Sequence, residues 1–420
     1  MSLSYSLYAR MRKLARKLPV YTHARRQLLQ EFNPQIINKI VDAAIENVPF
    51  YAGYKDLWNT QHQFDLLPII RKVDVVGHEQ ELISRSIPRF LLHCGVTGGT
   101  SGVTMKVYNT PFSSLRRFAM PDLAYEEIGR NLRVAELRKH SPRNGAIYED
   151  IGSNRVLLSS FQMSCDNVDE YVDVLKHQRI ECIHAYPSAL MVFIRLIHNR
   201  FGTLELSSLK GILTSSEILQ TDDKLLIKHV LGDSVKIVDY FGQSESVCSA
   251  YSVDGGPFIF NNNFGYVEFL DTGQLSPRGY QIAEIIATSL LCNTMTMIRF
   301  GTEDYVELDR EGNVVSIIGR RADTLVDKKG NLFTCFANVS LKSLKKISNY
   351  QFWQPEPGIL VYKLVPTKDF DESDRLQVLS ELMGTFPMLE CRVQVVESIC
   401  KTSSGKQMRV VRDFSLAEYQ

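Results

Sequence analysis

From about residue 60 onward, short apolar strand-like runs alternate with amphipathic helical spans and Gly or Ser turns. Residues 209–213, 235–239 and 281–288 have the composition of buried strands, and residues 222–231 have the apolar spacing of a helix. Because parallel strands need a crossover between them, this alternation is typical of a layered α/β architecture with a largely parallel or mixed sheet. The sequence predicts a large α/β domain over residues 41–319.

The character of the chain changes after about residue 320. A Lys/Gly turn at residues 328–330, helical spacing near residues 339–346 and a Pro-interrupted stretch at residues 354–358 follow one another. We predict a small, mobile α+β C-terminal lid domain over residues 320–420.

The N-terminal segment, residues 1–40, is locally basic. Seven Lys or Arg side chains and no acid occur in residues 10–26, whereas the whole chain has a formal net charge of +1. Helical spacing places on one face the apolar residues Leu7, Met11, Leu14 and Leu18. A basic amphipathic helix of this kind either packs on its own domain or contacts an anionic membrane surface or a partner.

Charge, cysteine usage and hydropathy exclude several classes of protein. A net charge of +1 provides no field that attracts a polyanion, so no nucleic acid is expected as a partner. The eight cysteines contain no C-x-x-C pair, so neither a structural zinc site nor a disulfide framework is indicated. A run of about 18 apolar residues and the apolar core of a secretory signal are both absent from the sequence. We expect a cytoplasmic protein, and leave open contact with the inner face of the membrane and a homodimer.

A Gly/Thr/Ser-rich stretch at residues 93–108 is the first of five segments suited to nucleotide chemistry. Its backbone N–H groups and hydroxyls can surround phosphate oxygens, since glycines permit close approach. The G-K-[ST] of a Walker P-loop is missing, and an ordinary hairpin turn explains the stretch equally well.

Two further segments follow predicted strands. Residues 239–246 lie just past a strand end, where ligands usually bind in open α/β sheets, and they offer aromatic rings, a hydroxyl and a carboxylate for a base and a metal-bound phosphate. Core aromatics and a helix cap are the alternative interpretation. Residues 299–304 end in a carboxylate that suits a ribose diol, or else form an acidic surface turn.

The last two segments lie in the C-terminal part. Residues 318–330 place a Gly-Arg pair where an interdomain hinge is expected, and residues 401–409 place Lys406 behind a Ser-Ser-Gly turn. Each segment alone also fits a solvated charged loop.

In order and spacing, the five segments resemble those of the adenylate-forming superfamily, which includes the acyl-CoA ligases. TGGTSG (97–102) resembles the phosphate loop TSGTTG, YFGQSE (240–245) resembles Y-G-x-T-E, RFGTED (299–304) resembles Y-R-T-G-D, and KTSSGK (401–406) resembles P-K-T-x-S-G-K.

Four shorter stretches narrow the resemblance to the phenylacetate-CoA ligases and CapK-type proteins: VPFY (48–51), LLPIIRK (66–72), AYPSAL (185–190) and TSSE (214–217). The resemblance covers roughly residues 40–415. It implies ATP-dependent activation of a carboxylic acid as acyl-AMP with Mg²⁺, then transfer to coenzyme A or to an amine of a sugar or amino acid. A nucleotide-binding accessory protein with impaired catalysis is a third reading.

The resemblance also implies roles for individual residues. Around the ATP phosphates it places Thr97, Gly98, Gly99, Thr100, Ser101 and Gly102. At the nucleotide it places Tyr240, Phe241, Gly242, Ser244, Asp304 and Arg320, with Phe241 on the adenine, Ser244 on phosphate and Asp304 on the ribose. The resemblance further implies that Glu245 holds Mg²⁺ and that Lys406 is the mobile adenylation lysine. For the acid pocket it provides His184, Tyr186, Pro187, Ser188, Ser215, Ser216 and Glu217.

The chain departs from the family pattern at two places. Gly98 replaces a hydroxyl residue and Val103 and Thr104 replace the usual Lys-Pro pair, so we expect weaker phosphate binding. At the hinge, Ala322 stands where the family has a pivoting Asp, which bears on the step with coenzyme A.

Overall fold

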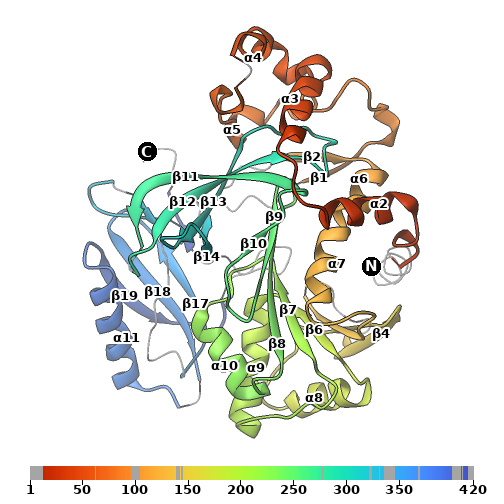
Figure 1. Cartoon of the computed structure of the whole chain (residues 1–420). Coiled ribbons are helices and arrows are strands. Elements are labelled where there is room, and N and C mark those ends of the chain that lie inside the picture. The colour runs from red at the N-terminus through yellow and green to blue at the C-terminus, as the bar shows by residue number, and fades with distance from the viewer. Residues whose placement is uncertain are drawn as a thin grey trace. The chain divides into compact units, whose positions relative to one another are not determined.

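The computed structural model describes residues 13–61, 63–96, 105–138, 142, 145–276, 278–320, 324–330, 332–334, 346–367, 369–399, 408 and 410–414. The chain is a mixed α/β protein with several sheets, as Figure 1 shows. Its described residues form two compact units, one within residues 13–130 and 238–317 and the other within residues 131–237 and 318–414. The predicted α/β class is confirmed.

The first unit combines an N-terminal helical part with antiparallel strands. Its helices are α2 (Pro19–Leu28), α3 (Gln35–Asn47), α4 (Lys55–Gln61), α5 (Lys72–Val75), α6 (Pro111–Arg117) and α7 (Ala119–Glu126), with the 3-10 turns η1 (Pro49–Tyr54), η2 (Phe64–Leu66) and η3 (Arg89–Leu91). Its strands are β1 (His93–Val96), β2 (Lys106–Asn109), β8 (Lys236–Gly242), β9 (Ser249–Val253), β10 (Ile259–Phe260), β11 (Gly265–Leu275), β12 (Gln281–Ser289), β13 (Phe300–Leu308) and β14 (Val314–Arg320). The chain enters this unit within β8 and leaves it within β14.

A four-stranded sheet in the order β11-β12-β13-β14 supports this unit. β11 pairs with β12 and β12 pairs with β13 in antiparallel register, and Figure 1 shows β11 and β12 as long neighbouring strands. Apart from Gln281, every residue of β12 is buried, because its side chains pack on both faces. Residues of α3, η1 and the sheet form one apolar cluster.

The described part of the basic N-terminal segment, residues 13–40, packs on its own unit. Arg16 binds Asp122 of α7 through two hydrogen bonds of 2.7 and 2.5 Å, and Tyr21 donates a third at 2.7 Å. Arg25 pairs with Glu126 at 2.5 Å. These contacts agree with the alternative in which the basic segment packs on its own domain.

One continuous basic helix is not what forms. A helical turn ends at residue 15 and α2 starts at Pro19, because proline is favoured in the first turn of a helix and interrupts one further along. Leu14 and Leu18, two of the four apolar residues that helical spacing places on one face, are both exposed. Leu7 and Met11 lie outside the described residues.

The second unit contains parallel strands, helices that pack on them and a C-terminal sheet. From its first segment come β3 (Val134–Leu137), β4 (Tyr148–Gly152), β5 (Arg155–Leu158), α8 (Val168–His177), β6 (Cys182–Ala185), α9 (Pro187–Phe201), β7 (Gly211–Ser215) and α10 (Thr221–Leu231). From its second segment come β15 (Thr324–Val326), β16 (Leu332–Thr334), β17 (Ile347–Gln354), β18 (Ile359–Pro366), α11 (Glu372–Thr385), β19 (Glu390–Val395) and β20 (Val410–Arg412).

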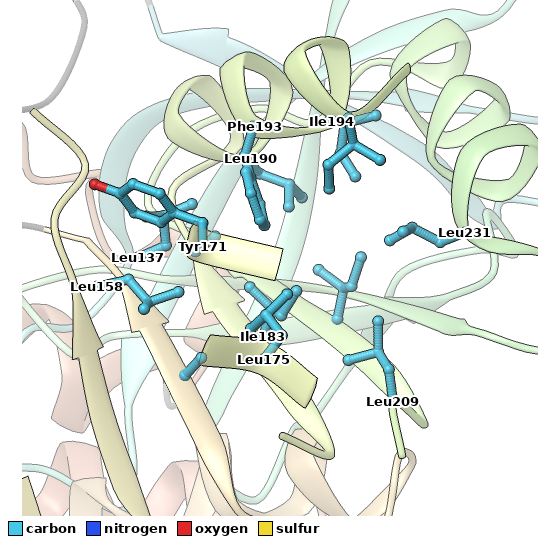
Figure 2. Packing of buried hydrophobic residues seen from close by; sticks show 14 of the residues in the cluster. Leu137, Leu158, Tyr171, Leu175, Ile183, Leu190, Phe193, Ile194, Leu209 and Leu231 are labelled. Carbon is cyan, nitrogen blue, oxygen red and sulfur yellow. The ribbon is translucent and has the colours of Figure 1, made fainter. Parts of the chain in front are cut away.

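The strands β7-β6-β3-β5 are parallel, and β4 is antiparallel to β5. Alternate side chains of these strands pack against α8, α9 and α10, and Figure 2 shows Tyr171, Phe193 and Ile183 in this cluster. The alternate strand positions include buried polar groups, among them His184 and the ion-paired Arg155 and Glu136. One face of the sheet is thus an apolar core, and the other mixes apolar and polar side chains.

The C-terminal part is a sheet in the order β19-β18-β17-β20, covered by α11 (Figure 1). The N-terminus of α11 is fixed by a capping box of Asp371 and Asp374. Arg195 of α9 donates to the carbonyl oxygens of Ile347 (2.9 Å) and Ser348 (2.8 Å), which joins this sheet to the parallel-strand part of the same unit.

Most of the predicted elements are confirmed. Residues 209–213, 222–231, 235–239 and 281–288 correspond to β7, α10, β8 and β12, and the turn at residues 328–330 connects β15 and β16. The helical span near residues 339–346 lies outside the described residues, apart from Lys346. A boundary between domains at residues 319 and 320 stays a prediction. Among the described residues, no helix has the length and apolarity needed to span a membrane.

Candidate functional site

Asp304 and the 240–245 segment meet in the first unit. Asp304 is 3% exposed on β13, and its Oδ2 accepts a hydrogen bond of 2.5 Å from Nε2 of Gln243, which follows β8. The Gln243 Oε1 in turn lies 3.6 Å from the thiol of Cys248. Two of the segments predicted to bind nucleotide are therefore joined by a direct contact.

Cys248 reports the local electrostatics of this cluster. Burial raises the pKa of its thiol well above the usual value, and the negative charges of Asp304 and Glu245 act in the same direction. A thiol that stays protonated is a poor nucleophile. Cys248 is accordingly a packing residue beside two carboxylates rather than a reactive cysteine.

The two aromatic residues of the segment have different surroundings. Tyr240 packs against a cluster that includes Tyr21 of α2, and its ring lies so close to Gly242 that a Cβ there would be 2.9 Å from its hydroxyl. Phe241 packs on the sheet cluster next to Phe260, with ring centroids 6.1 Å apart. Gly242 and Ser244 are exposed, and Glu245 is half-buried. Both rings thus have a packing role in addition to any contact with a ligand.

Two shorter motifs of the sequence hold the segment that carries Asp304. Ile70 donates from its backbone N–H to Arg299 at 3.1 Å and accepts from Gly301 at 2.9 Å. The hydroxyl of Tyr51 donates to the carbonyl of Thr296 at 3.1 Å and accepts from the N–H of Ile298 at 2.9 Å. Hydrogen bonds from the motifs at residues 66–72 and 48–51 therefore stabilise the backbone at residues 296–301, which leads to Asp304.

An ion pair beside Asp304 was not predicted from the sequence. Arg71 contacts the carboxylate of Glu284 on β12, and the same carboxylate accepts from the N–H of Glu303 at 3.3 Å. Gly301 leaves room for Arg71, because a Cβ at that position would collide with the guanidinium. The only local signal in the sequence is a charged residue inside a strand that is otherwise apolar.

The acid-pocket candidates gather in the second unit, where β6 and β7 end. His184 is buried, and its Nε2 lies 3.2 Å from Oγ of Ser215. Glu217 accepts from the backbone N–H of Ser188 at 2.9 Å, so its carboxylate caps the start of α9. Tyr186 is buried directly before α9, and Pro187 is the first residue of that helix.

Left-handed backbone accompanies the candidate segments. Ser216 has φ +73°, Ser246, directly after Glu245, has +58°, and Glu303, directly before Asp304, has +59°. Residues other than glycine rarely adopt such angles, and strained positions of this kind gather at functional sites.

Several predicted residues cannot be placed. Thr97, Gly98, Gly99, Thr100, Ser101, Gly102, Val103, Thr104, Ala322 and Lys406 lie outside the described residues. Arg320 ends β14, and only its backbone is described.

Arg138 was also not predicted. It follows β3, and its guanidinium carbon lies 4.9 Å from the centre of the Tyr186 ring. No pattern in its charged sequence neighbourhood, LRKHSPR, singles it out.

Comparison with known proteins gives a likeness of fold. No protein family model matches the sequence, and no curated protein sequence matches it. Among solved structures, 2-hydroxyisobutyryl-CoA ligase in its postadenylation state with R3-HIB-AMP has a TM-score of 0.62 at 13% identity, over 90% of this chain and 88% of that one.

Two other solved structures match with lower TM-scores and over a smaller share of this chain. The anthranilate-CoA ligase AuaEII with anthranoyl-AMP has a TM-score of 0.52 at 14% identity, over 75% of this chain and 65% of that one. The amide bond synthetase McbA from Marinactinospora thermotolerans has a TM-score of 0.52 at 17% identity, over 75% of this chain and 67% of that one. The chain has the fold of the adenylate-forming ligases.

Proposed function

We propose that this chain activates a carboxylic acid with ATP, forming an acyl-adenylate and pyrophosphate, and then transfers the acyl group to the thiol of coenzyme A. The observation that carries the proposal is the hydrogen bond between Gln243 and Asp304, which joins two motifs that are far apart in sequence. The fold, similar over 90% of the chain to a ligase bound to an acyl-adenylate, supports it.

In the first unit, the residues around this hydrogen bond contact the nucleotide. Phe241 stacks on the adenine, Asp304 receives the ribose hydroxyls, and Ser244, which is exposed, contacts a phosphate. Gln243 orients the carboxylate of Asp304 by donating to one of its oxygens. Tyr240 and Gly242 shape the strand end on which these groups lie.

Mg²⁺ fits this arrangement through Glu245. Magnesium in nucleotide enzymes is held by one or two carboxylates together with substrate phosphates, so a single protein carboxylate suffices. Within the described parts of the chain, no three His, Cys, Asp or Glu side chains gather into a metal site of their own. When bound with ATP, the ion supplies positive charge to the triphosphate.

The first chemical step joins two anions. A carboxylate oxygen of the acid attacks the α-phosphorus, a new P–O bond forms, and pyrophosphate leaves as the bond to the β-phosphate oxygen breaks. Residues 97–102 surround the phosphates, and Lys406 places a cation where negative charge grows in the transition state. Arg320 contacts the nucleotide at the proposed boundary between a large domain and a C-terminal lid.

The acid binds at the end of the parallel strands in the second unit. His184, Ser215 and Tyr186 lie at this edge, and Ser216 has a left-handed backbone there. Glu217 and Ser188 fix the start of α9, because the carboxylate of Glu217 accepts the Ser188 N–H. Their role is to hold the shape of the pocket wall.

The acyl acceptor distinguishes two forms of the proposal. With coenzyme A, the thiol sulfur attacks the acyl carbon and loses its proton, a C–S bond forms, and AMP leaves as the bond between the acyl carbon and the AMP oxygen breaks. The similarity in fold to an amide bond synthetase favours, as a second candidate, an amine acceptor on a sugar or amino acid. In both forms the adenylation step is the same.

Acid-dependent exchange of labelled pyrophosphate into ATP, measured over a broad panel of carboxylic acids, tests the first step. Lys406→Ala should lower the exchange rate about a hundredfold, since loss of one preorganised cation or donor costs about 3 kcal/mol. Lys401→Ala, which removes a charge from the same C-terminal segment, is the matched control and should stay within about threefold of the unmodified protein. Absence of exchange with every acid would refute the proposal. Mass spectrometry after addition of coenzyme A or of amines then identifies the acceptor.

A further inference from the structure

Arg138 occupies the edge of the sheet where the acid is proposed to bind. Leu137 pairs with Ala185 and Ala185 pairs with Thr214 across β3, β6 and β7. The residues that follow each of these positions are therefore neighbours at the carboxyl ends of three parallel strands. They are Arg138, Tyr186 and Ser215. The backbone N–H of Tyr186 also donates to the carbonyl of Leu137 at 3.2 Å, which continues the alignment to the edge.

The guanidinium of Arg138 contacts an aromatic ring, but one of its hydrogen-bond donors has no acceptor in the residues that the structure describes. It lies 4.9 Å from the centre of the Tyr186 ring, in a cation–π contact. Its Nε atom is buried and has no hydrogen-bond acceptor among the described residues. A buried donor without an acceptor is costly, because the desolvation of that group is not offset.

Two other arginines of the same sheet show the contrast. Arg155 pairs with the buried carboxylate of Glu136, and Arg133 pairs with Asp150 at 2.7 Å. Ion pairs with carboxylates thus bind these two arginines, whereas no ion pair among the described residues includes Arg138. An acceptor delivered by a ligand would complete it.

The geometry favours an anionic oxygen along the edge of the guanidinium. The Nε atom lacks an acceptor in the described part of the chain, and Nε together with one Nη has the spacing that matches the two oxygens of a carboxylate. We propose that Arg138 is a specificity-determining residue and that the acid activated by this chain carries a second carboxylate, which binds Arg138. This inference rests on the proposed function and names the class of its acid.

The test uses matched pairs of acids that differ by the second carboxylate: butanoate with butanedioate, and benzoate with benzene-1,4-dicarboxylate. Binding of each acid is measured by calorimetry, without catalysis, and kcat/KM is measured by pyrophosphate exchange. The variants are Arg138→Gln, Arg138→Lys and the control Arg200→Gln, which removes an exposed charge from the same unit.

We expect at least one diacid to bind more tightly than its monoacid partner. Arg138→Gln should lower the affinity and kcat/KM for that diacid about 10- to 100-fold, which is the range for a lost charged hydrogen-bonded contact. The affinity and kcat/KM for the monoacid should change less than about threefold. Arg138→Lys should recover part of the loss, because it keeps the charge without the planar fork. Arg200→Gln should leave the affinity and kcat/KM for both acids unchanged.

Three results would overturn the inference: no preference for either diacid, an equal effect of Arg138→Gln on both members of a pair, or an effect on KM for ATP alone. A failed exchange reaction with every acid counts against the proposed function instead. The calorimetric preference and its loss in Arg138→Gln still decide the role of Arg138 in that case.

Discussion

The ion pair between Arg71 and Glu284 permits a quantitative prediction. Glu284 is 5% exposed, and its carboxylate contacts Arg71 and the N–H of Glu303. Arg71→Met would leave a buried carboxylate with one backbone donor. Removal of one partner of a fully buried pair costs about 3–5 kcal/mol. Since the Arg71 side chain is 36% exposed, water can replace part of the contact, and we expect a loss of about 2–3 kcal/mol.

Calorimetric unfolding measures this loss. A destabilisation of about 2–3 kcal/mol should lower the Tm of the transition that reports the first unit by about 4–10 °C. Arg310→Met is the matched control, because Arg310 is exposed in the turn after β13, and it should change stability by less than about 0.5 kcal/mol.

A double-mutant cycle separates the charge effect from lost packing. Glu284→Gln removes the buried charge, so the double variant Arg71→Met, Glu284→Gln should lose less stability than the sum of the two single changes. We expect a coupling of at least about 1 kcal/mol. Strict additivity, or a cost of Arg71→Met no larger than that of Arg310→Met, would show that the pair does not support the turn next to Asp304.

Further predictions concern packing, pH and thiol chemistry. Gly265→Ala should destabilise by about 3 kcal/mol in calorimetric unfolding, because the new Cβ would overlap the backbone carbonyl of Val247; a neutral result would contradict that approach. The pKa of Glu181 is lowered, chiefly by its hydrogen bond from Lys210, so its stabilising contribution is present above its unfolded pKa near 4.5 and is lost as pH falls through the lower folded value. Glu181→Gln should therefore lower the Tm at pH 7, and the Tm of the variant should fall less steeply than that of the unmodified protein as the pH drops below about 4.5. An identical dependence of Tm on pH in the two proteins would contradict this role of Glu181. A maleimide probe followed by mass spectrometry should label the exposed Cys165 in the folded protein far faster than Cys248, whose thiol is buried with a raised pKa; equal rates would disagree.

Local patterns predicted the elements better than their limits. The apolar run at residues 209–213 identified β7, but the strand starts at Gly211, because pairing with Cys182 of β6 begins there. Leu209 instead donates from its backbone N–H to Leu206 in a turn. The edge of a strand thus depends on its neighbour, which a single sequence run does not contain.

The motifs indicated which segments form the candidate site, but not how they are held. Gln243 and Asp304 are 61 positions apart, and Arg71 and Glu284 are 213 apart, so no local spacing predicts either contact. Arg138 carries no motif at all, and only the register of β3, β6 and β7 places it beside Tyr186. Long-range pairing was the missing information in all three cases.

Oxygen transfer from the substrate acid to AMP tests the central claim most directly. When the carboxylate attacks the α-phosphorus, one of its oxygens becomes the bridging oxygen of the acyl-adenylate and leaves with AMP after acyl transfer. An acid that supports pyrophosphate exchange, labelled with ¹⁸O in its carboxylate, should therefore give AMP that contains one ¹⁸O atom by mass spectrometry. Label in inorganic phosphate with formation of ADP, or unlabelled AMP, would contradict an adenylation mechanism.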